Sequence, residues 1–106
     1  MFAQSHRFSF KKGVPRNFYQ TRLFVIRYEK NAEGIFKCAV VVGKKVDKRA
    51  VIRNKVKRQL VEILREMIVI DTKLTIAVYA KKPILEAELD ERKTELKKAL
   101  TTIGIL

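Results

Sequence analysis

The chain has 106 residues, of which 47% are hydrophobic, so it is long enough for one domain with a single core and too short for two. Its 24 Lys and Arg residues outnumber 11 Asp and Glu residues, and the net charge of +13 favours a polyanionic partner, either nucleic acid or an anionic membrane surface. No apolar run approaches the roughly 18 residues of a membrane-spanning helix, and the N-terminal residues lack the order of a secretion signal, so we expect no membrane association.

The N-terminal residues are basic and irregular. Six basic residues and no acidic residue occur among the first 28. Gly13 and Pro15 disfavour a helix in this region. We therefore predict one domain over residues 1–106, in which residues 1–20 form an extended or loosely ordered basic arm and residues 21–106 form the globular part.

Three segments have the composition of strands. Residues 22–28 are rich in β-branched and aromatic side chains, residues 31–34 (NAEG) carry turn chemistry, and a second strand pattern covers residues 35–43. We therefore predict a β-hairpin made of these two strands. Residues 74–80 alternate in polarity, which predicts a half-buried strand that ends before Pro83.

Two segments carry the periodicity of amphipathic helices. In the first, Asp47 occupies the predicted N-cap of a helix that starts near Lys48. The apolar residues that form one stripe along this helix are Ile52, Val56, Leu60, Ile63, Leu64 and Met67. The second helix, from about Asp90, has nearly balanced charge. The order arm, β, β, α, β, α indicates an α+β fold with helices against one face of a sheet.

A cluster of like charge lies at the start of the first helix. Residues 44–58, KKVDKRAVIRNKVKR, contain eight Lys and Arg residues and one Asp. Cations at a helix start are disfavoured by roughly 0.3–1 kcal/mol each at exposed positions, and the acids Glu62 and Glu66 come only later, where cations would be preferred. Lysines on a helix usually form an ordinary solvated face. This arrangement instead favours phosphate binding by the cluster.

The sequence offers no catalytic constellation. His6 is the one histidine, and Cys38, the one cysteine, lies in a predicted strand, where a buried structural role is typical. A single cysteine also excludes an internal disulfide and suits the reducing cytoplasm, where we expect the protein. Gly43 lacks the second glycine of a phosphate-binding loop. The carboxylates of residues 86–95 fit a solvated helix face better than a metal site.

Aromatic residues are interleaved with the cations of the arm, where Phe8, Phe10, Phe18 and Tyr19 occur. Rings among cations suit single-stranded RNA, because its unstacked bases pack on aromatic side chains. For Phe24, in the first predicted strand, core packing is the favoured role. For Phe8 and Phe10, RNA contact and core packing both stay open.

The stretch KKVDKRAVIRNKVKRQLVEILR, residues 44–65, resembles the signature of the bacterial ribonuclease P protein subunit, in which a basic pattern follows a strand and opens a helix. The order and spacing of the elements fit that family from about Arg22 to the C-terminus. The residues that match the signature are Lys44, Lys45, Ala50, Val51, Arg53, Asn54, Lys57, Arg58, Glu62 and Arg65.

The resemblance implies a two-layer α/β sandwich of the ribosomal S5 domain 2-like type, with a mostly antiparallel sheet and the basic helix in a left-handed βαβ crossover. It also implies a monomeric protein subunit, one per RNA subunit, of a ribonucleoprotein endoribonuclease. In that enzyme the RNA subunit removes the 5′ leader of precursor tRNA by hydrolysis, with magnesium ions bound mainly by RNA phosphates. The protein assists by binding the RNA subunit and the leader, and no catalytic or metal-ligating residue is expected in this chain.

The basic cluster and the resemblance together predict two sets of binding residues. Those expected to bind ribonuclease P RNA are Lys44, Lys45, Lys48, Arg49, Arg53, Asn54, Lys55, Lys57, Arg58 and Arg65. Those expected to bind the leader are Arg7, Phe8, Phe10, Lys11, Lys12 and Arg27. The chain departs from the family pattern at Val61 and Lys55, where arginine is usual, and at Gly13 and Pro15, which occupy much of the usual first helix with its aromatic pair.

Two other functions fit parts of the sequence. A small basic ribosomal protein that binds ribosomal RNA would share the size and charge. An autonomous nuclease would need catalytic residues that the sequence does not offer. The sequence leaves open which nucleotides are contacted, whether the arm is ordered without RNA, whether an aromatic pair lines a cleft, and whether the protein self-associates.

Overall fold

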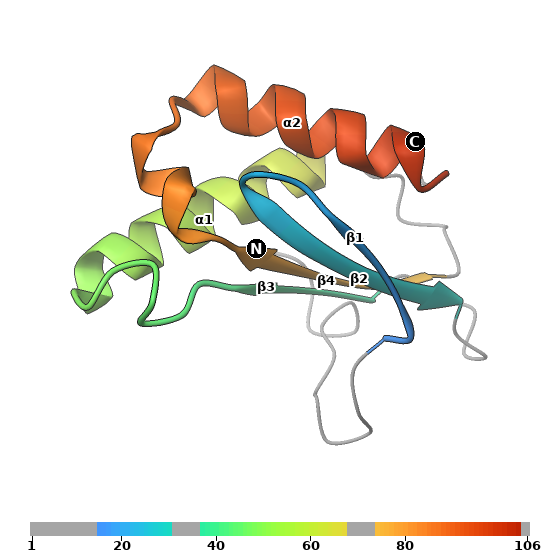
Figure 1. The fold of residues 1–106 in the computed structure, drawn as a ribbon, viewed down its shortest axis with the longest axis horizontal. Helices are drawn as coiled ribbons and strands as arrows, with labels where there is room; N and C mark the ends of the chain where they lie inside the picture. Colours follow the sequence, from blue (N-terminus) through green and yellow to red (C-terminus); the bar gives the residue numbers. More distant parts are fainter. Residues whose placement is uncertain (1–14, 31–36, 68–73, 105–106) are drawn as a thin grey trace.

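The structure is a computed structural model that describes residues 15–30, 37–67 and 74–104. It has a four-stranded sheet with both helices on one of its faces (Figure 1). The elements in chain order are β1 (Asn17–Gln20), β2 (Phe24–Lys30), β3 (Lys37–Val41), α1 (Ala50–Met67), β4 (Leu74–Ala80), the 3-10 helix η3 (Lys82–Glu86) and α2 (Leu89–Thr102). The predicted α+β class is confirmed. Strand β1 lies at the end of the region predicted as the basic arm, so this part of the arm belongs to the sheet.

The strand order is β1-β2-β4-β3, which places β4 between β2 and β3. Strand β2 pairs antiparallel with β1 and with β4, whereas β3 pairs parallel with β4. The predicted hairpin between the strands that became β2 and β3 is therefore wrong. The prediction rested on the turn-forming residues 31–34, which lie outside the described part of the chain. Such a local pattern does not show which strands pair. The pairing follows instead from burial, because the most apolar strand takes the centre of the sheet.

Strand β4 is more buried than its alternating pattern predicted. Each side chain from Thr75 to Val78 is buried, so both faces of the strand are covered at its centre. Ala77 lies on the face away from the helices and is paired with Arg27 on one side and Ala39 on the other. The half-buried prediction failed here because a small residue flanked by two strands is shielded even without a covering helix.

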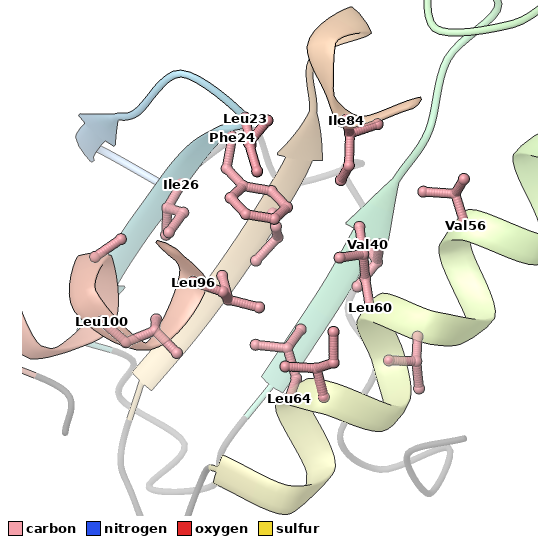
Figure 2. Packing of buried hydrophobic residues seen from close by; sticks show 14 of the residues in the cluster. Leu23, Phe24, Ile26, Val40, Val56, Leu60, Leu64, Ile84, Leu96 and Leu100 are labelled. Atoms are coloured by element: carbon pink, nitrogen blue, oxygen red, sulfur yellow. The ribbon is translucent and has the colours of Figure 1, made fainter. Parts of the chain in front are cut away.

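The core lies between the sheet and the two helices (Figure 2). Its members from both layers include Phe24, Ile26, Val40, Val56, Leu60, Leu64, Leu96 and Leu100. Burial of each large apolar side chain contributes roughly 1.5–3 kcal/mol. The predicted apolar stripe of α1 is confirmed, although Ile52 and Met67 at its two ends are only partly buried. The core role favoured for Phe24 is confirmed as well.

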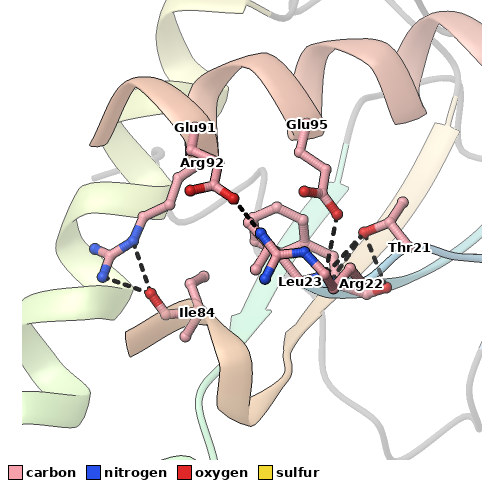
Figure 3. Close-up of polar contacts among 8 residues, drawn as sticks. Thr21, Arg22, Leu23, Ile84, Glu91, Arg92 and Glu95 are labelled. Atoms are coloured by element: carbon pink, nitrogen blue, oxygen red, sulfur yellow. Dashed lines mark hydrogen bonds and ion pairs between the residues drawn. The ribbon is translucent and has the colours of Figure 1, made fainter. Parts of the chain in front are cut away.

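Polar contacts attach α2 to the start of β2 (Figure 3). The Thr21 hydroxyl accepts a hydrogen bond from the Leu23 backbone N–H at 3.2 Å, and the Glu95 carboxylate accepts another from the same N–H at 3.1 Å. Arg22 forms an ion pair with Glu91, one turn earlier on α2. Glu91 and Glu95 of α2 therefore serve the fold.

Candidate nucleic-acid interface

The loop between β3 and α1 presents lysines from a fixed turn. The backbone N–H of Val46 donates to the Gly43 carbonyl at 3.0 Å, and the Val46 side chain is buried in the core. Lys44 and Lys45, between them, are exposed. One buried valine therefore anchors a charged loop and leaves its lysines in solvent.

Asp47 fixes the approach to α1 but is not the N-cap that the sequence predicted. Helix α1 begins at Ala50, so Arg49 is the N-cap residue, and its carbonyl accepts the first helical hydrogen bond from the Arg53 N–H at 3.1 Å. The Asp47 carboxylate accepts hydrogen bonds from Arg49, from the backbone N–H at 2.8 Å and from the guanidinium at 3.1 and 2.8 Å. The prediction was wrong because an aspartate can close a turn two residues ahead as well as cap a helix.

These bonds dominate the electrostatics of Asp47. The Arg49 side chain first, and then the Arg49 backbone N–H, lower the pKa of the Asp47 carboxyl to about 2. The carboxylate thus stays ionised and engaged by Arg49 at neutral pH. The first turn of α1 contains no acidic residue, so no carboxylate within that turn offsets its positive charge.

Arg53 binds the loop from within the helix. One of its guanidinium nitrogens, Nη1, donates to the carbonyls of Lys48 at 2.8 Å and Asp47 at 3.2 Å. The side chain is partly buried, whereas the other Lys and Arg side chains of residues 44–58 are exposed. Its other nitrogens, Nε and Nη2, make no hydrogen bond with a described residue and leave donors for a ligand. Arg53, predicted to bind RNA, therefore also holds the loop against α1.

The other predicted residues at this end of α1 lie together and are exposed. We call the cations of residues 44–58 the basic end. Its exposed members, with one amide, are Lys44, Lys45, Lys48, Arg49, Asn54, Lys55, Lys57 and Arg58. Among the described residues only Arg49 of this group has a carboxylate partner. The basic end is therefore a surface of unneutralised charge, and the helix dipole adds partial positive charge at the same place.

Two positions further along α1 do not join this surface. Arg65 lies 12 residues beyond Arg53, about 18 Å along the helix, and its guanidinium pairs with Glu62 at 3.3 Å. Val61, where the family pattern has arginine, is buried in the core. The structure thus separates Arg65 from the other residues predicted to bind RNA.

The sheet face away from the helices carries a second candidate surface. Arg27 and Phe18 are register partners on β2 and β1, and the guanidinium carbon of Arg27 lies 5.7 Å from the ring centroid of Phe18. Arg27 Nη1 also donates to the Pro15 carbonyl at 3.1 Å. Phe18 is 61% exposed, which leaves most of its ring available. A cation and an open aromatic ring side by side suit a single-stranded nucleic acid.

Tyr79 belongs to this sheet face, because its register partner Val25 lies on the same side as Arg27. Burial raises the pKa of the Tyr79 hydroxyl, so the group is a neutral donor and acceptor at physiological pH. Sequence reasoning named Arg27 for the leader but missed Tyr79, and treated Phe18 only as one ring of the arm. The other residues predicted for the leader lie outside the described residues; they are Arg7, Phe8, Phe10, Lys11 and Lys12.

The described ranges show no candidate for metal binding or covalent chemistry. They contain no group of three or more His, Cys, Asp or Glu side chains placed to hold a metal ion. Burial raises the pKa of the Cys38 thiol to about 12, so it stays protonated inside the core. None of the described helices combines the length and apolar character that crossing a membrane requires.

Comparisons with known proteins agree on one family. The family model described as Ribonuclease P matches residues 4–104. The ribonuclease P protein component of Mesoplasma florum is 33% identical over 94 residues, which cover 86% of this chain and 84% of that protein. The component of Mycoplasma capricolum is 47% identical over 60 residues, 57% of this chain and 50% of that protein.

A solved structure has the same fold. The Staphylococcus aureus RNase P protein superimposes with a TM-score of 0.77 at 25% identity, and the match covers 94% of this chain and 96% of that one. The four-stranded sheet with two helices described above is therefore the arrangement of an RNase P protein.

Proposed function

The chain belongs to the ribonuclease P protein component family, and from this membership we propose that it is the protein subunit that helps a catalytic RNA remove the 5′ leader of precursor tRNA. The observation that carries the proposal is the basic end. It presents exposed cations at a helix start, and Arg49 is its one member with a carboxylate partner among the described residues. Such a surface is suited to RNA phosphates.

Ribonuclease P RNA is the proposed partner of the basic end. Two RNAs repel each other through their phosphates, and a protein that neutralises phosphates releases their counterions, which drives association. Asp47 and Arg53 keep the loop and the first turn of α1 in one arrangement. The cations therefore need little reorganisation when RNA binds, which lowers the entropic cost of binding. Asn54 adds a donor and an acceptor for sugar or base edges.

The leader of precursor tRNA is the proposed ligand of the open sheet face. Arg27 would contact a leader phosphate while an unstacked base packs on Phe18, which is 61% exposed. Tyr79 would donate from the neighbouring strand. This surface lies on the face of the sheet opposite α1, so one protein would contact the RNA subunit and the leader at different places.

Hydrolysis is assigned to the RNA subunit. Magnesium ions, bound mainly by RNA phosphates, would supply a metal-bound nucleophile and stabilise charge at the scissile phosphate. The chain's own residues bind and orient RNA, and by lowering the repulsion between RNA strands they would favour metal binding to those phosphates. We propose a monomer, bound one to one with the RNA subunit, in the cytoplasm.

The test is reconstitution of the full chain with the ribonuclease P RNA of the same source. We expect the protein to raise the rate of precursor tRNA cleavage at low magnesium concentration and to have no activity without the RNA. Cleavage by the protein alone, after rigorous removal of RNA, would contradict the proposal. So would purification of the protein from cells with ribosomal RNA in place of ribonuclease P RNA.

A further inference from the structure

A pocket of about 320 Å³ lies between the start of α1, the 3-10 helix η3 and the start of α2. Its walls combine polar groups with apolar side chains, among them Ile52, Leu85 and Leu89. The polar residues at the pocket are Lys55, Gln59 and Arg92. Both charged residues are cations, and no carboxylate lines the pocket, which makes it a place for an anionic ligand with an apolar portion.

Arg92 is held at this pocket without an anion. Its Nε and Nη2 donate to the Ile84 carbonyl at 3.1 and 2.7 Å (Figure 3), and its Nη1 donates to the side-chain oxygen of Gln59. No carboxylate of the described chain pairs with it, and burial lowers the pKa of the guanidinium. Two of its five N–H groups remain for a ligand, and they lie on a side chain whose position is already fixed.

The apolar side chains at the rim of the pocket are open to a ligand. Leu85 and Leu89 are 37% and 43% exposed, so the rim of the pocket presents uncovered hydrocarbon beside the cations. The volume is within the usual range for pockets that bind small organic groups. Gln59, whose side-chain oxygen is engaged by Arg92, keeps its amide N–H groups for the edge of a ligand.

The position of Lys55 connects this pocket with the basic end. Lys55 belongs to the same helix as Lys57 and Arg58, which are exposed. At about 100° per residue, Lys55 lies on the same side of α1 as Arg58, and Lys57 lies on the other side. An RNA strand whose phosphates contact Arg58 and Lys55 would reach the pocket mouth. Cations beside apolar side chains match one nucleotide of such a strand, with its phosphate at the cations and its base against the hydrocarbon.

We propose that this pocket takes one unstacked nucleotide of RNA, with the phosphate at Lys55 and Arg92 and the base against Ile52, Leu85 and Leu89. The inference rests on the proposed function and adds to it a site on the helix layer, separate from the open sheet face. The nucleotide belongs to a single-stranded or bulged segment, because a base in a duplex cannot leave its stack without a further cost.

The experiment titrates the full chain, labelled at its Ile, Leu and Val methyl groups, with pentaadenylate and follows the methyl NMR signals and the affinity. A pentamer of abasic ribose phosphates carries the same backbone without bases, and pentaglutamate is an anion without nucleotides. The variant Leu89→Asp puts a carboxylate at the pocket mouth. Thr94→Asp adds the same charge at an exposed α2 position outside the pocket, and Leu85→Asp is the second pocket variant.

We expect the Leu85 and Leu89 methyl signals to shift with pentaadenylate and not with the abasic pentamer. Leu89→Asp should weaken pentaadenylate binding roughly threefold to tenfold, less than the loss of a base from an aromatic platform, while Thr94→Asp stays within about twofold. Leu85→Asp should show the same loss. Melting curves identify a variant that fails to fold. If one of the two pocket variants does not fold, the affinity of the other one tests the proposal.

Three results would overturn the proposal, and they differ in what they leave standing. Shifts confined to Val46 and Val51, which lie outside the pocket, would remove the pocket and keep the proposed RNA binding. Equal methyl shifts with the abasic pentamer or with pentaglutamate would show that the pocket takes an anion or an acidic peptide and not a base. Absence of any shift or affinity with pentaadenylate would remove the pocket, and the reconstitution with ribonuclease P RNA would then decide the proposed function separately.

Discussion

The two halves of α1 share one apolar stripe and differ in how their charges are used. In the second half, Arg65 pairs with Glu62 at 3.3 Å, and Glu66 lies 4.0 Å from Lys93 of α2. In the first half and in the loop before it, the cations of the basic end have no carboxylate partner among the described residues, apart from Arg49. Charge that is paired within the chain serves the fold. Unpaired charge at a helix start, where it is disfavoured, indicates a ligand outside the chain.

Charge reversal in α1 and in α2 should give the largest difference in affinity for ribonuclease P RNA. The double variant Lys57→Glu/Arg58→Glu places acids in the basic end, and we expect affinity for ribonuclease P RNA to fall about 100-fold or more at moderate salt. The matched control reverses Lys97 and Lys98, two exposed lysines of α2. Filter binding should show a change within about threefold for this control. Equal losses for both variants would mean that only net charge matters.

The sheet face should respond to a different feature of the substrate. Phe18→Ala removes a ring that is 61% exposed, so the fold should be retained. Loss of base stacking, worth roughly 1–3 kcal/mol, should weaken precursor tRNA binding by about fivefold or more. Binding of tRNA without a leader, measured in the reconstituted enzyme, should not change. A similar loss for both substrates would place the ring outside the leader site.

Arg53 tests whether charge or hydrogen-bond geometry matters at the basic end. Arg53→Lys keeps the charge but loses the fork that reaches the Asp47 and Lys48 carbonyls. We expect RNA affinity to fall severalfold with an unchanged salt slope, and amide hydrogen exchange at residues 47–49 to become faster. The same loss of affinity without faster exchange would instead make Arg53 a phosphate ligand only.

Asp47 makes the free energy of unfolding depend on pH. The pKa of its carboxyl is about 2 in the folded protein, below the value of about 3.9 in an unfolded chain. The stabilisation is therefore complete above about pH 5 and is lost progressively as the pH falls towards 2. Urea unfolding at pH 7, 4 and 3 should show a smaller decrease for Asp47→Asn than for the wild-type protein. Parallel decreases would show that this carboxylate does not stabilise the fold.

Mutations in the second half of α1, where the charges are paired, should have the smallest effect on stability and on RNA affinity. Glu62→Gln breaks the exposed ion pair with Arg65, and such pairs contribute roughly 0.2–0.5 kcal/mol. Chemical unfolding should detect a change no larger than this, and RNA affinity should stay within about twofold. A tenfold change in affinity would extend the RNA surface to the second half of the helix.

Local patterns in the sequence were enough to locate the basic end and the apolar stripe of α1. They were not enough for the sheet, because strand β4 enters between β2 and β3, and a turn-like segment cannot reveal which distant strand will pair. Asp47 was recognised as a local cap, but whether it closes a turn or caps a helix depends on where α1 begins.

The contributions of several residues depend on contacts that no sequence spacing shows. Arg53 turns back to the loop carbonyls, and Arg92 crosses from α2 to η3 and α1. The pocket at Arg92 is made by α1 and by residues 85–92, two segments that are far apart in the chain. Phe18 and Tyr79 lie on the same sheet face only because of the strand order.

RNA binding by the basic end is best tested through the salt dependence of affinity for ribonuclease P RNA in two neutralising variants, Lys57→Gln in the basic end and Lys97→Gln on α2. We expect the slope of log affinity against log salt to fall by about one for Lys57→Gln and to be unchanged for Lys97→Gln. Equal slopes for Lys57→Gln and the wild-type protein would contradict the claim that the basic end binds RNA phosphates.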